Sequence, residues 1–240
     1  MSGHSKWATI HRKKGLIDAA RGKVFQKLAK EIYVAAKSGT PDVNSNSSLR
    51  MVVEKAKAAN MPKDNIEKAI DKAKGASEGE NFESILYEGY GKGGVAIMVM
   101  CLTDNRNRTA SMVRSTFTKY GGNLGTDGSV SYLFERKGII QIPNQYSEDE
   151  VMMTALDAGA TDMETLEDTY LITTPSDKFI AVKDALTAMG VAEFLTSEVT
   201  FVANNPVSVN DDIKESVNNL IIHLEDLDDV NEVYSNLESE

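Results

Sequence analysis

Basic side chains gathered in the first third of the chain are the residues whose type and spacing could do chemistry, and that chemistry is the binding of an anion. Residues 1–76 hold 16 Lys/Arg and 7 Asp/Glu, a net charge of +9, whereas residues 77–240 hold 10 and 29, a net charge of −19. Charges more than about 10 Å apart are largely screened at moderate salt. A polyanion near the first third therefore meets a positive field, although the whole chain carries −10.

One helix expected in this region places its lysines on a single face. Its apolar positions recur at spacings of three and four, which predicts a helix over residues 21–38; they are Phe25, Leu28, Ile32 and Ala36. On the opposite face, four lysines fall within about 80° of one another in a row about 20 Å long. They are Lys23, Lys27, Lys30 and Lys37. Such a row can follow several phosphates of a nucleic acid; the alternative is a solvated basic surface.

A basic arm of irregular sequence, residues 1–20, precedes this helix. Trp7, the only tryptophan, either anchors the arm on the body of the protein or stacks on a base. We expect arm and helix to contact phosphates without reading base sequence, because no helix-turn-helix or RNA-recognition signature is present. The residues predicted to bind nucleic acid are Lys6, Trp7, Arg12, Lys13, Lys14, Arg21, Lys23, Lys27, Lys30 and Lys37.

A further anion contact is predicted where a buried strand ends and a helix, expected over 107–120, begins. The sequence there is D-N-R-N-R-T, residues 104–109. Free amides at a helix amino end, helped by Arg106 and Arg108, suit a phosphate such as those of RNA. The alternative is a helix capped by Asn107, with both arginines solvated.

Groupings of residues typical of enzymes are sparse. The histidines His4, His11 and His223 lack metal-binding spacing, and one cysteine cannot build a multi-cysteine site, so we expect no metal and no cofactor. Residues 89–94 match G-x-G-x-x-G but lead into a strand, which predicts a turn between strands and no dinucleotide site. The acidic run 225–229 lacks the ligand pattern of a calcium loop and is interpreted as a solvated turn. We therefore expect no catalytic residue and no enzyme.

The order of predicted elements indicates an α+β fold with three domains. Helices over 21–38, 47–59 and 62–75 predict an amino-terminal helical bundle. From residue 138 to 202 the pattern runs strand, helix, strand, strand, helix, strand, the ferredoxin-like order. This segment is predicted to form a domain of its own.

The remaining elements flank that segment on both sides. Strands at 85–90, 95–102 and 129–135, with the helix at 107–120, come before it; a helix at 210–225 and a strand at 230–237 follow it. The second group is too small to fold alone and is predicted to complete the sheet that the first group begins. We therefore expect a helical bundle plus two α/β domains of ferredoxin-like type, one inserted in the other: residues 1–76, 82–136 plus 204–240, and 137–203.

Charge also predicts partners for the inserted domain. Residues 137–203 hold 3 Lys/Arg and 12 Asp/Glu, so nucleic acid should repel them and a protein partner or solvent should face them. No stretch reaches the roughly 18 apolar residues of a membrane span and no secretory signal is evident, so we expect no membrane contact. A single cysteine fits a reducing compartment, and we expect the cytoplasm.

Five separated motifs resemble those of YebC-like proteins. They are Gly3–Trp7, Arg21–Lys23, Tyr87–Gly91, Asp104–Thr109 and Gly121–Val130. They stand in the family's order and span nearly the whole chain, so chance agreement is negligible. The resemblance implies a helical amino-terminal domain and two α/β domains, one inserted in the other, in agreement with the division reached from the residues.

The resemblance implies two kinds of activity. Bacterial members are generally described as probable transcriptional regulators that bind promoter DNA. Other members, a mitochondrial translational activator among them, are similar to ribosome-associated factors that assist translation through difficult stretches such as consecutive prolines. The start Gly3–Trp7 resembles the first branch, whereas residues 31–39 and 66–75 are closer to the second. We expect a DNA-binding transcriptional regulatory protein; the alternative is a ribosome-associated translation factor that contacts ribosomal RNA or tRNA.

Overall fold

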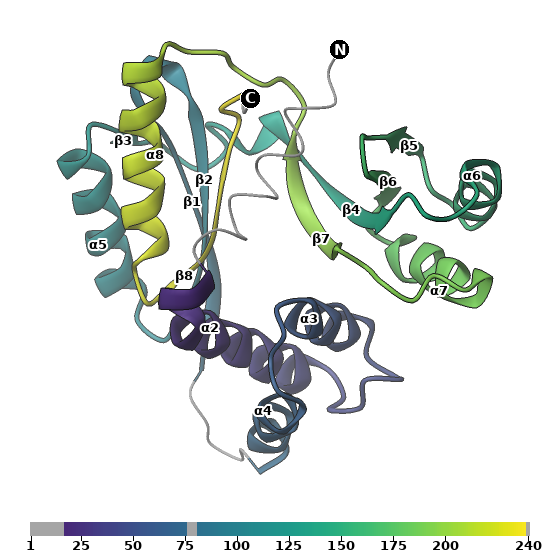
Figure 1. Cartoon of the computed structure of the whole chain (residues 1–240). Coiled ribbons are helices and arrows are strands. Elements are labelled where there is room, and N and C mark those ends of the chain that lie inside the picture. Colours follow the sequence, from purple (N-terminus) through teal and green to yellow (C-terminus); the bar gives the residue numbers. More distant parts are fainter. Residues whose placement is uncertain (1–16, 76–80, 239–240) are drawn as a thin grey trace. The chain divides into compact units, whose positions relative to one another are not determined.

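The structure of the protein, a computed structural model, describes residues 17–75 and 81–238, with only the backbone described for residues 17–21 (Figure 1). The described residues form two compact units. One contains the residues up to Val34 together with those of Ala76–Glu135 and Val202–Glu240; the other contains Ala35–Gly75 and Arg136–Phe201. The three-domain division made from the sequence stays a prediction.

Residues 17–75 contain the three helices that the sequence predicts. Leu28, Ile32 and Ala36 are buried on the predicted apolar face of the first. The second is capped by Asn46, whose side-chain oxygen accepts from the backbone N–H of Leu49 at 3.0 Å. The helices are α2 (Ile17–Ser38), α3 (Ser47–Ala58) and α4 (Lys63–Gly75).

The first sheet lies in the unit that contains both ends of the described chain. Its strands are β1 (Glu83–Tyr90), β2 (Ala96–Thr103), β3 (Asn123–Leu124) and β8 (Val230–Ser235), in the order β3-β1-β2-β8. β1 and β2 are antiparallel, with Tyr87 opposite Val99. The short helix η1 (Lys92–Gly94) joins them, so the G-x-G-x-x-G segment is a turn between strands, as predicted.

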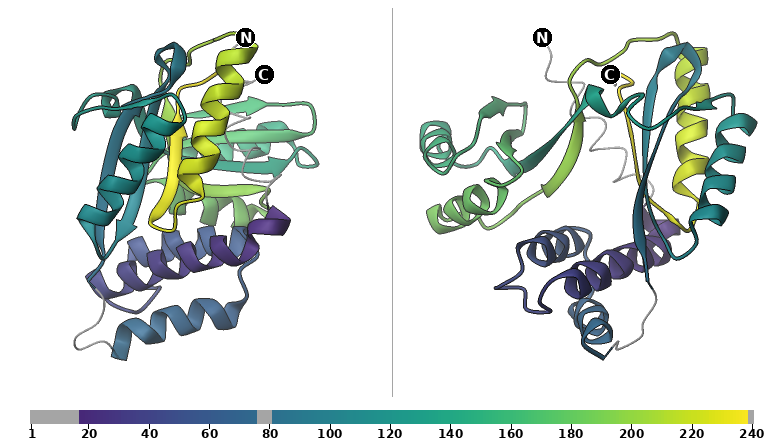
Figure 2. Two further views of the ribbon diagram at one scale, coloured as in Figure 1. Left: turned by 90° about the vertical axis from the view of Figure 1, so that its left-hand side faces the viewer. Right: turned by 180° about the vertical axis from the view of Figure 1, so that it is seen from behind.

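Two helices cover one face of this sheet and lie side by side (Figure 2, left). They are α5 (Arg106–Lys119) and α8 (Asp211–Glu225). Val113 and Phe117 from α5 and Leu220 and Leu224 from α8 pack on the strands, and all four are buried. Cys101 lies in the same core, and burial raises the pKa of its thiol to about 12, so the side chain behaves as a small apolar group.

The second sheet has the predicted ferredoxin-like order. Its elements are β4 (Phe134–Pro143), α6 (Glu148–Asp157), β5 (Asp162–Thr165), β6 (Thr169–Pro175), α7 (Phe179–Met189) and β7 (Thr196–Ala203). The strand order is β5-β6-β4-β7, with β4 and β5 both antiparallel to β6. Two four-stranded sheets with helices confirm the α+β class and the ferredoxin-like segment.

One predicted strand is wrong. The sequence predicts a strand over 129–135, but residues Ser131–Leu133 form the short helix η2, and β4 begins only at Phe134. The backbone N–H groups of Val130 and Ser131 donate to the carboxylate of Glu88, so they are unavailable to a strand ladder. Tyr132, in the middle of η2, is 69% exposed.

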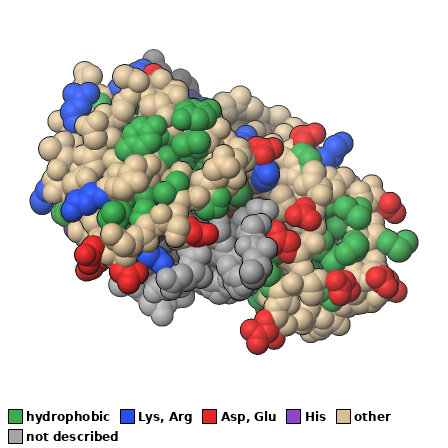
Figure 3. Space-filling model, turned by 90° about the horizontal axis from the view of Figure 1, so that it is seen from above, with side chains coloured by type: hydrophobic (Ala, Val, Ile, Leu, Met, Phe, Trp, Pro, Cys, Tyr) green, Lys and Arg blue, Asp and Glu red, His purple; other side chains and the backbone are tan. Residues whose placement is uncertain are grey.

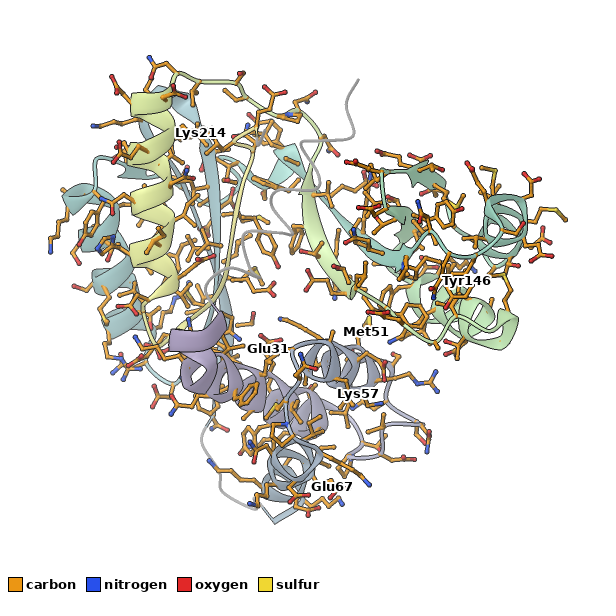
Figure 4. The ribbon with its side chains drawn as sticks, in the orientation of Figure 1. Glu31, Met51, Lys57, Glu67, Tyr146 and Lys214 are labelled. Carbon is orange, nitrogen blue, oxygen red and sulfur yellow. The ribbon has the colours of Figure 1, made fainter. Side chains whose placement is uncertain are left out.

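Helix α3 packs against the helices of the second sheet, which belong to the same compact unit. Met51 of α3 contacts the apolar core that α6, α7 and β6 form (Figure 4). Lys183 of α7 donates to Glu54 of α3, and Arg50 Nη1 lies 3.8 Å from Asp184 Oδ2.

Within the described ranges, each helix is too short or too polar to cross a membrane.

Candidate nucleic-acid interface

The residues predicted to bind nucleic acid fall into two groups in the structure. Lys6, Trp7, Arg12, Lys13 and Lys14 lie outside the described residues, and of Arg21 only the backbone in α2 is described. The other group lies on α2 and is fully described. Its members are Lys23, Lys27, Lys30 and Lys37.

Three lysines of α2 contact the end of α8 and the residues that follow it, Glu225–Asp229, which we call the acidic turn. Lys23 Nζ donates to Asp226 Oδ1 at 2.5 Å. Lys27 Nζ donates to the carbonyl oxygen of Glu225 at 2.6 Å, and Lys30 Nζ donates to that of Asp228 at 3.2 Å. Most of the lysine face of α2 is therefore occupied by the chain itself.

The physical reason for these contacts is the carboxyl end of α8. The last carbonyls of a helix lack partners within the helix and carry partial negative charge, which cations nearby stabilise. Burial lowers the pKa of Lys27, while the negative charge of Glu225 opposes that change. The hydrogen bond to Asp226 raises the pKa of Lys23. The lysine face thus caps a helix, a role the sequence pattern alone did not reveal.

The acidic turn is solvated only in part: Asp226 and Asp228 are exposed, as the sequence interpretation expects, whereas Asp229 is buried. Asp229 is only 6% exposed and accepts from Arg108 Nη2 at 2.8 Å and from Thr109 Oγ1 at 2.9 Å. Its backbone carbonyl accepts from the N–H of Leu102 at 2.8 Å. Burial alone would raise the pKa of Asp229, but the bonds from Arg108 and Thr109 outweigh burial and lower it. The turn is a structural hub between α2, α5 and β2.

The arginines at the start of α5 have different surroundings. The helix cap is Asn105, whose Oδ1 accepts from the backbone N–H of Arg108 at 3.0 Å, so the predicted cap at Asn107 is wrong. Arg108 also pairs with Asp104 at 2.8 Å and so holds two carboxylates of its own chain. Arg106 is 67% exposed, and its Nη1 lies 4.0 Å from Glu83 Oε2. Only Arg106 of the two presents its charge mainly to solvent.

The lysines of α3 and α4 pair within their own helices. Lys57 Nζ lies 2.8 Å from Glu54 Oε1, and Lys63 Nζ lies 3.5 Å from Glu67 Oε1. Lys57 and Glu67 are labelled in Figure 4. Lys63 and Glu67 are both exposed, so their pair contributes little to stability and Lys63 can exchange a carboxylate for a phosphate at small cost; Glu54 is only 19% exposed and also binds Lys183.

Glu88 is a key residue that the sequence analysis did not single out. Its carboxylate accepts from the backbone N–H groups of Gly128, Val130 and Ser131, each at 2.7 Å. Burial would raise the pKa of Glu88, but these three bonds lower it. The carboxylate thereby ties the motif at Tyr87–Gly91 to the motif at Gly121–Val130, two segments that the sequence shows only as separate. The sequence feature that could have pointed to Glu88 is a carboxylate within a strand otherwise rich in apolar and aromatic residues.

Close packing explains two glycines of the same motifs. A Cβ on Gly89 would lie 2.6 Å from the carbonyl oxygen of Asn123, and one on Gly122 would lie 2.7 Å from Leu220 Cδ2. Both positions need the absence of a side chain, because β1, β3 and α8 approach one another there. These motifs therefore build the sheet, and nothing in their geometry requires a ligand.

The fold defines an α+β protein with two four-stranded sheets, the second of ferredoxin-like order, and a basic first third. Among residues 17–75 and 81–238, no group of three or more His, Cys, Asp or Glu side chains is placed to hold a metal ion. Ion pairs and helix caps account for most of the charged side chains described above.

Comparison with known proteins identifies the family. Residues 5–76 match the model described as the TACO1/YebC protein N-terminal domain, and residues 82–237 match that of the TACO1/YebC second and third domain. The chain belongs to the TACO1/YebC family. The resemblance drawn from the five motifs is confirmed.

Individual relatives cover the whole chain. A probable transcriptional regulatory protein of Geobacillus kaustophilus is 54% identical over 241 residues, which cover 99% of this chain and 98% of that protein. The probable transcriptional regulatory protein YrbC of Bacillus subtilis is 50% identical and matches 100% of both chains. The crystal structure of a conserved hypothetical protein from Aquifex aeolicus is 46% identical, with a TM-score of 0.79 over 92% of each chain.

Proposed function

We propose that this protein is a DNA-binding transcriptional regulator that works without catalysis and holds phosphates through its basic first third. The observation that carries the proposal is the separation of charge, +9 on residues 1–76 against −19 on residues 77–240. The names of the relatives support regulation of transcription. A cytoplasmic location and the absence of a cofactor belong to the same proposal.

The contacts of α2 limit which of the predicted cationic residues can bind a phosphate. Lys23, Lys27 and Lys30 already donate to the acidic turn, so a phosphate would have to displace oxygens of the chain to reach them. The proposal therefore rests mainly on the other predicted residues. They are Lys6, Trp7, Arg12, Lys13, Lys14 and Arg21. Lys37 is exposed in the last turn of α2 but also has an interaction of its own, so it contributes less.

The acidic segment 137–203 is proposed to face a protein partner or solvent. Asp and Glu side chains, red in Figure 3, are scattered over the face drawn there, and the segment 137–203 holds 12 of them against 3 Lys/Arg. A nucleic acid would be repelled there, which disfavours indiscriminate binding over the whole surface.

A pair of charge reversals tests the proposal without disturbing the acidic turn. Lys13→Glu with Lys14→Glu changes the arm, and Lys92→Glu with Lys178→Glu, at exposed positions elsewhere, changes net charge by the same amount. We expect the arm variant to bind duplex DNA at least about ten-fold more weakly and the control to differ little, since direct phosphate contacts dominate affinity. Equal affinity of the arm variant and the native protein would overturn the phosphate contact.

The choice between DNA and the ribosome needs a second measurement. The native protein is sedimented with ribosomes and titrated with duplex DNA at the same near-physiological salt. DNA binding that persists supports the transcriptional role. DNA binding that vanishes while ribosome association persists would overturn it in favour of a translation factor.

A further inference from the structure

Helix α5 has a composition unlike the sequence around it. Residues 77–240 hold 29 Asp/Glu and 10 Lys/Arg, yet the 14 residues of α5 hold four of those cations and no acid. Two of the four stand in the first turn, where the positive end of the helix dipole disfavours them. A basic helix within so acidic a segment requires an explanation.

Part of the charge is used within the protein. Arg108 is held by Asp104 and Asp229. Lys119 Nζ lies 5.2 Å from the centre of the Tyr120 ring, which in turn stacks on His223 with ring centres 3.8 Å apart. Arg114 is exposed and forms no ion pair with any described residue, and Arg106 has only the 4.0 Å approach to Glu83. Two arginines therefore remain available to an anion.

Arg106, the first of these two arginines, lies beside an aromatic side chain. The hydroxyl of Tyr87 donates to the carbonyl oxygen of Arg106 at 3.4 Å. Burial raises the pKa of Tyr87, and the positive charges of Arg106 and Arg114 oppose that rise. β3 pairs only with residues 89–90 of β1, so Tyr87 lies beyond the paired part of that edge.

The spacing of the arginines suits a polymer of phosphates. Arg106 and Arg114 are eight residues apart, which is about 12 Å along the helix. One strand of a duplex advances about 3.4 Å per phosphate, so this length spans about three or four phosphates. Exposed Asn107 and Ser111 on α5 add hydrogen-bonding groups. An isolated small anion would need only one of the two arginines.

We propose that Tyr87, Arg106 and Arg114, which we call the α5 patch, form a second nucleic-acid contact surface that binds the sugar–phosphate backbone separately from the basic first third. The inference rests on the proposed function, because it takes the same class of partner. It differs in assigning part of the affinity to a helix in the acidic part of the sequence. Arginine suits this role, since its planar group forms two parallel hydrogen bonds to a phosphate.

The test compares Arg106→Glu with Arg114→Glu against Lys92→Glu with Lys178→Glu, which changes net charge equally. The probes are a labelled duplex of about 20 base pairs and a single-stranded RNA of similar length, titrated at several salt concentrations. We expect the α5 variant to bind at least about ten-fold more weakly and its salt dependence to fall by about one to two in slope. A loss equal to that of the control would overturn the proposal.

Two further variants ensure that the binding experiment either supports or overturns the proposal. Arg106→Gln with Arg114→Gln removes both positive charges without adding carboxylates. If the Glu variant fails to fold, the nucleic-acid affinity of this Gln variant tests the α5 patch instead. The arm variant Lys13→Glu with Lys14→Glu separates the two proposals. If only the arm variant loses binding, the proposed function stands and the α5 patch falls; if the native protein binds neither probe, both fall.

Discussion

Helices α2 and α5 are both basic, but they differ in how many of their cations are bound by the protein itself and how many are exposed to solvent. Three of the four lysines of α2, Lys23, Lys27 and Lys30, lie against the carboxyl end of α8 and its acidic turn, where they donate to one carboxylate and to backbone carbonyls. On α5, Arg108 is held in the same way, whereas Arg106 and Arg114 face outward. A row of cations is therefore a binding surface only where no helix end or carboxylate of the same chain lies opposite.

The largest effect is expected at the hub that fixes the acidic turn. Asp229→Ala removes the acceptor shared by Arg108 and Thr109: the guanidinium loses two of its hydrogen bonds and keeps Asp104, while the Thr109 hydroxyl keeps its contacts with Thr103 and Asn105. We expect the free energy of unfolding to fall by about 2–3 kcal/mol, measured by urea denaturation. Asp228→Ala is the control, because Lys30 contacts only the backbone of that exposed residue. A similar loss of stability in both variants would contradict the claim that the Asp229 carboxylate fixes the acidic turn.

The next effect concerns the lysine face itself. Lys27→Glu places a carboxylate against the carbonyl of Glu225 and should lower the free energy of unfolding by about 1–2 kcal/mol. Gln26→Glu adds a negative charge at an exposed position of the same helix and should change stability by no more than about 0.5 kcal/mol. Equal stability of the two variants would mean that α2 does not cap α8.

Stability should also depend on pH through Glu88. The folded-state pKa of Glu88 is lowered, so its stabilisation is present above the ordinary value of about 4.3 and is lost as the pH falls toward the folded-state pKa. Glu88→Gln cannot ionise and should flatten this loss. Urea denaturation at neutral pH and near pH 4 checks it: the native protein should lose more stability than the variant. Parallel losses would show that the carboxylate is not ionised in the fold.

The smallest effect is expected on the outward face of α5. Arg114→Glu breaks no ion pair among the described residues, so its thermal midpoint should match that of the native protein within the equivalent of about 0.5 kcal/mol. Together with Lys27→Glu, this measurement sharpens the contrast between the helices. A large loss of stability in Arg114→Glu would show that α5 is also engaged within the fold.

The order of helices and strands could be predicted because each element has its own periodicity. The apolar spacing of α2 and the unbroken apolar run of β2 each indicate one structure from neighbouring residues alone. The strand expected over 129–135 fails for a different reason. Its alternating pattern is real, but Glu88, some 40 residues earlier, takes the backbone N–H groups that a strand would need.

The candidate site was harder to predict, because its contacts join distant parts of the chain. Lys23 and Asp226 are 203 positions apart, and Arg108 and Asp229 are 121 apart. No local pattern shows that these charges meet. The cap of α5 illustrates the same limit, since Asn105 and Asn107 are equal in type and only the position of the first turn selects Asn105.

The most direct test of the account is photochemical cross-linking of the native protein to a labelled nucleic acid, with the linked peptides identified by mass spectrometry. The account predicts links in the arm before α2 and in the segment that contains Arg106 and Arg114, and none within residues 137–203. Links confined to residues 137–203, with none in the arm or α5, would contradict it.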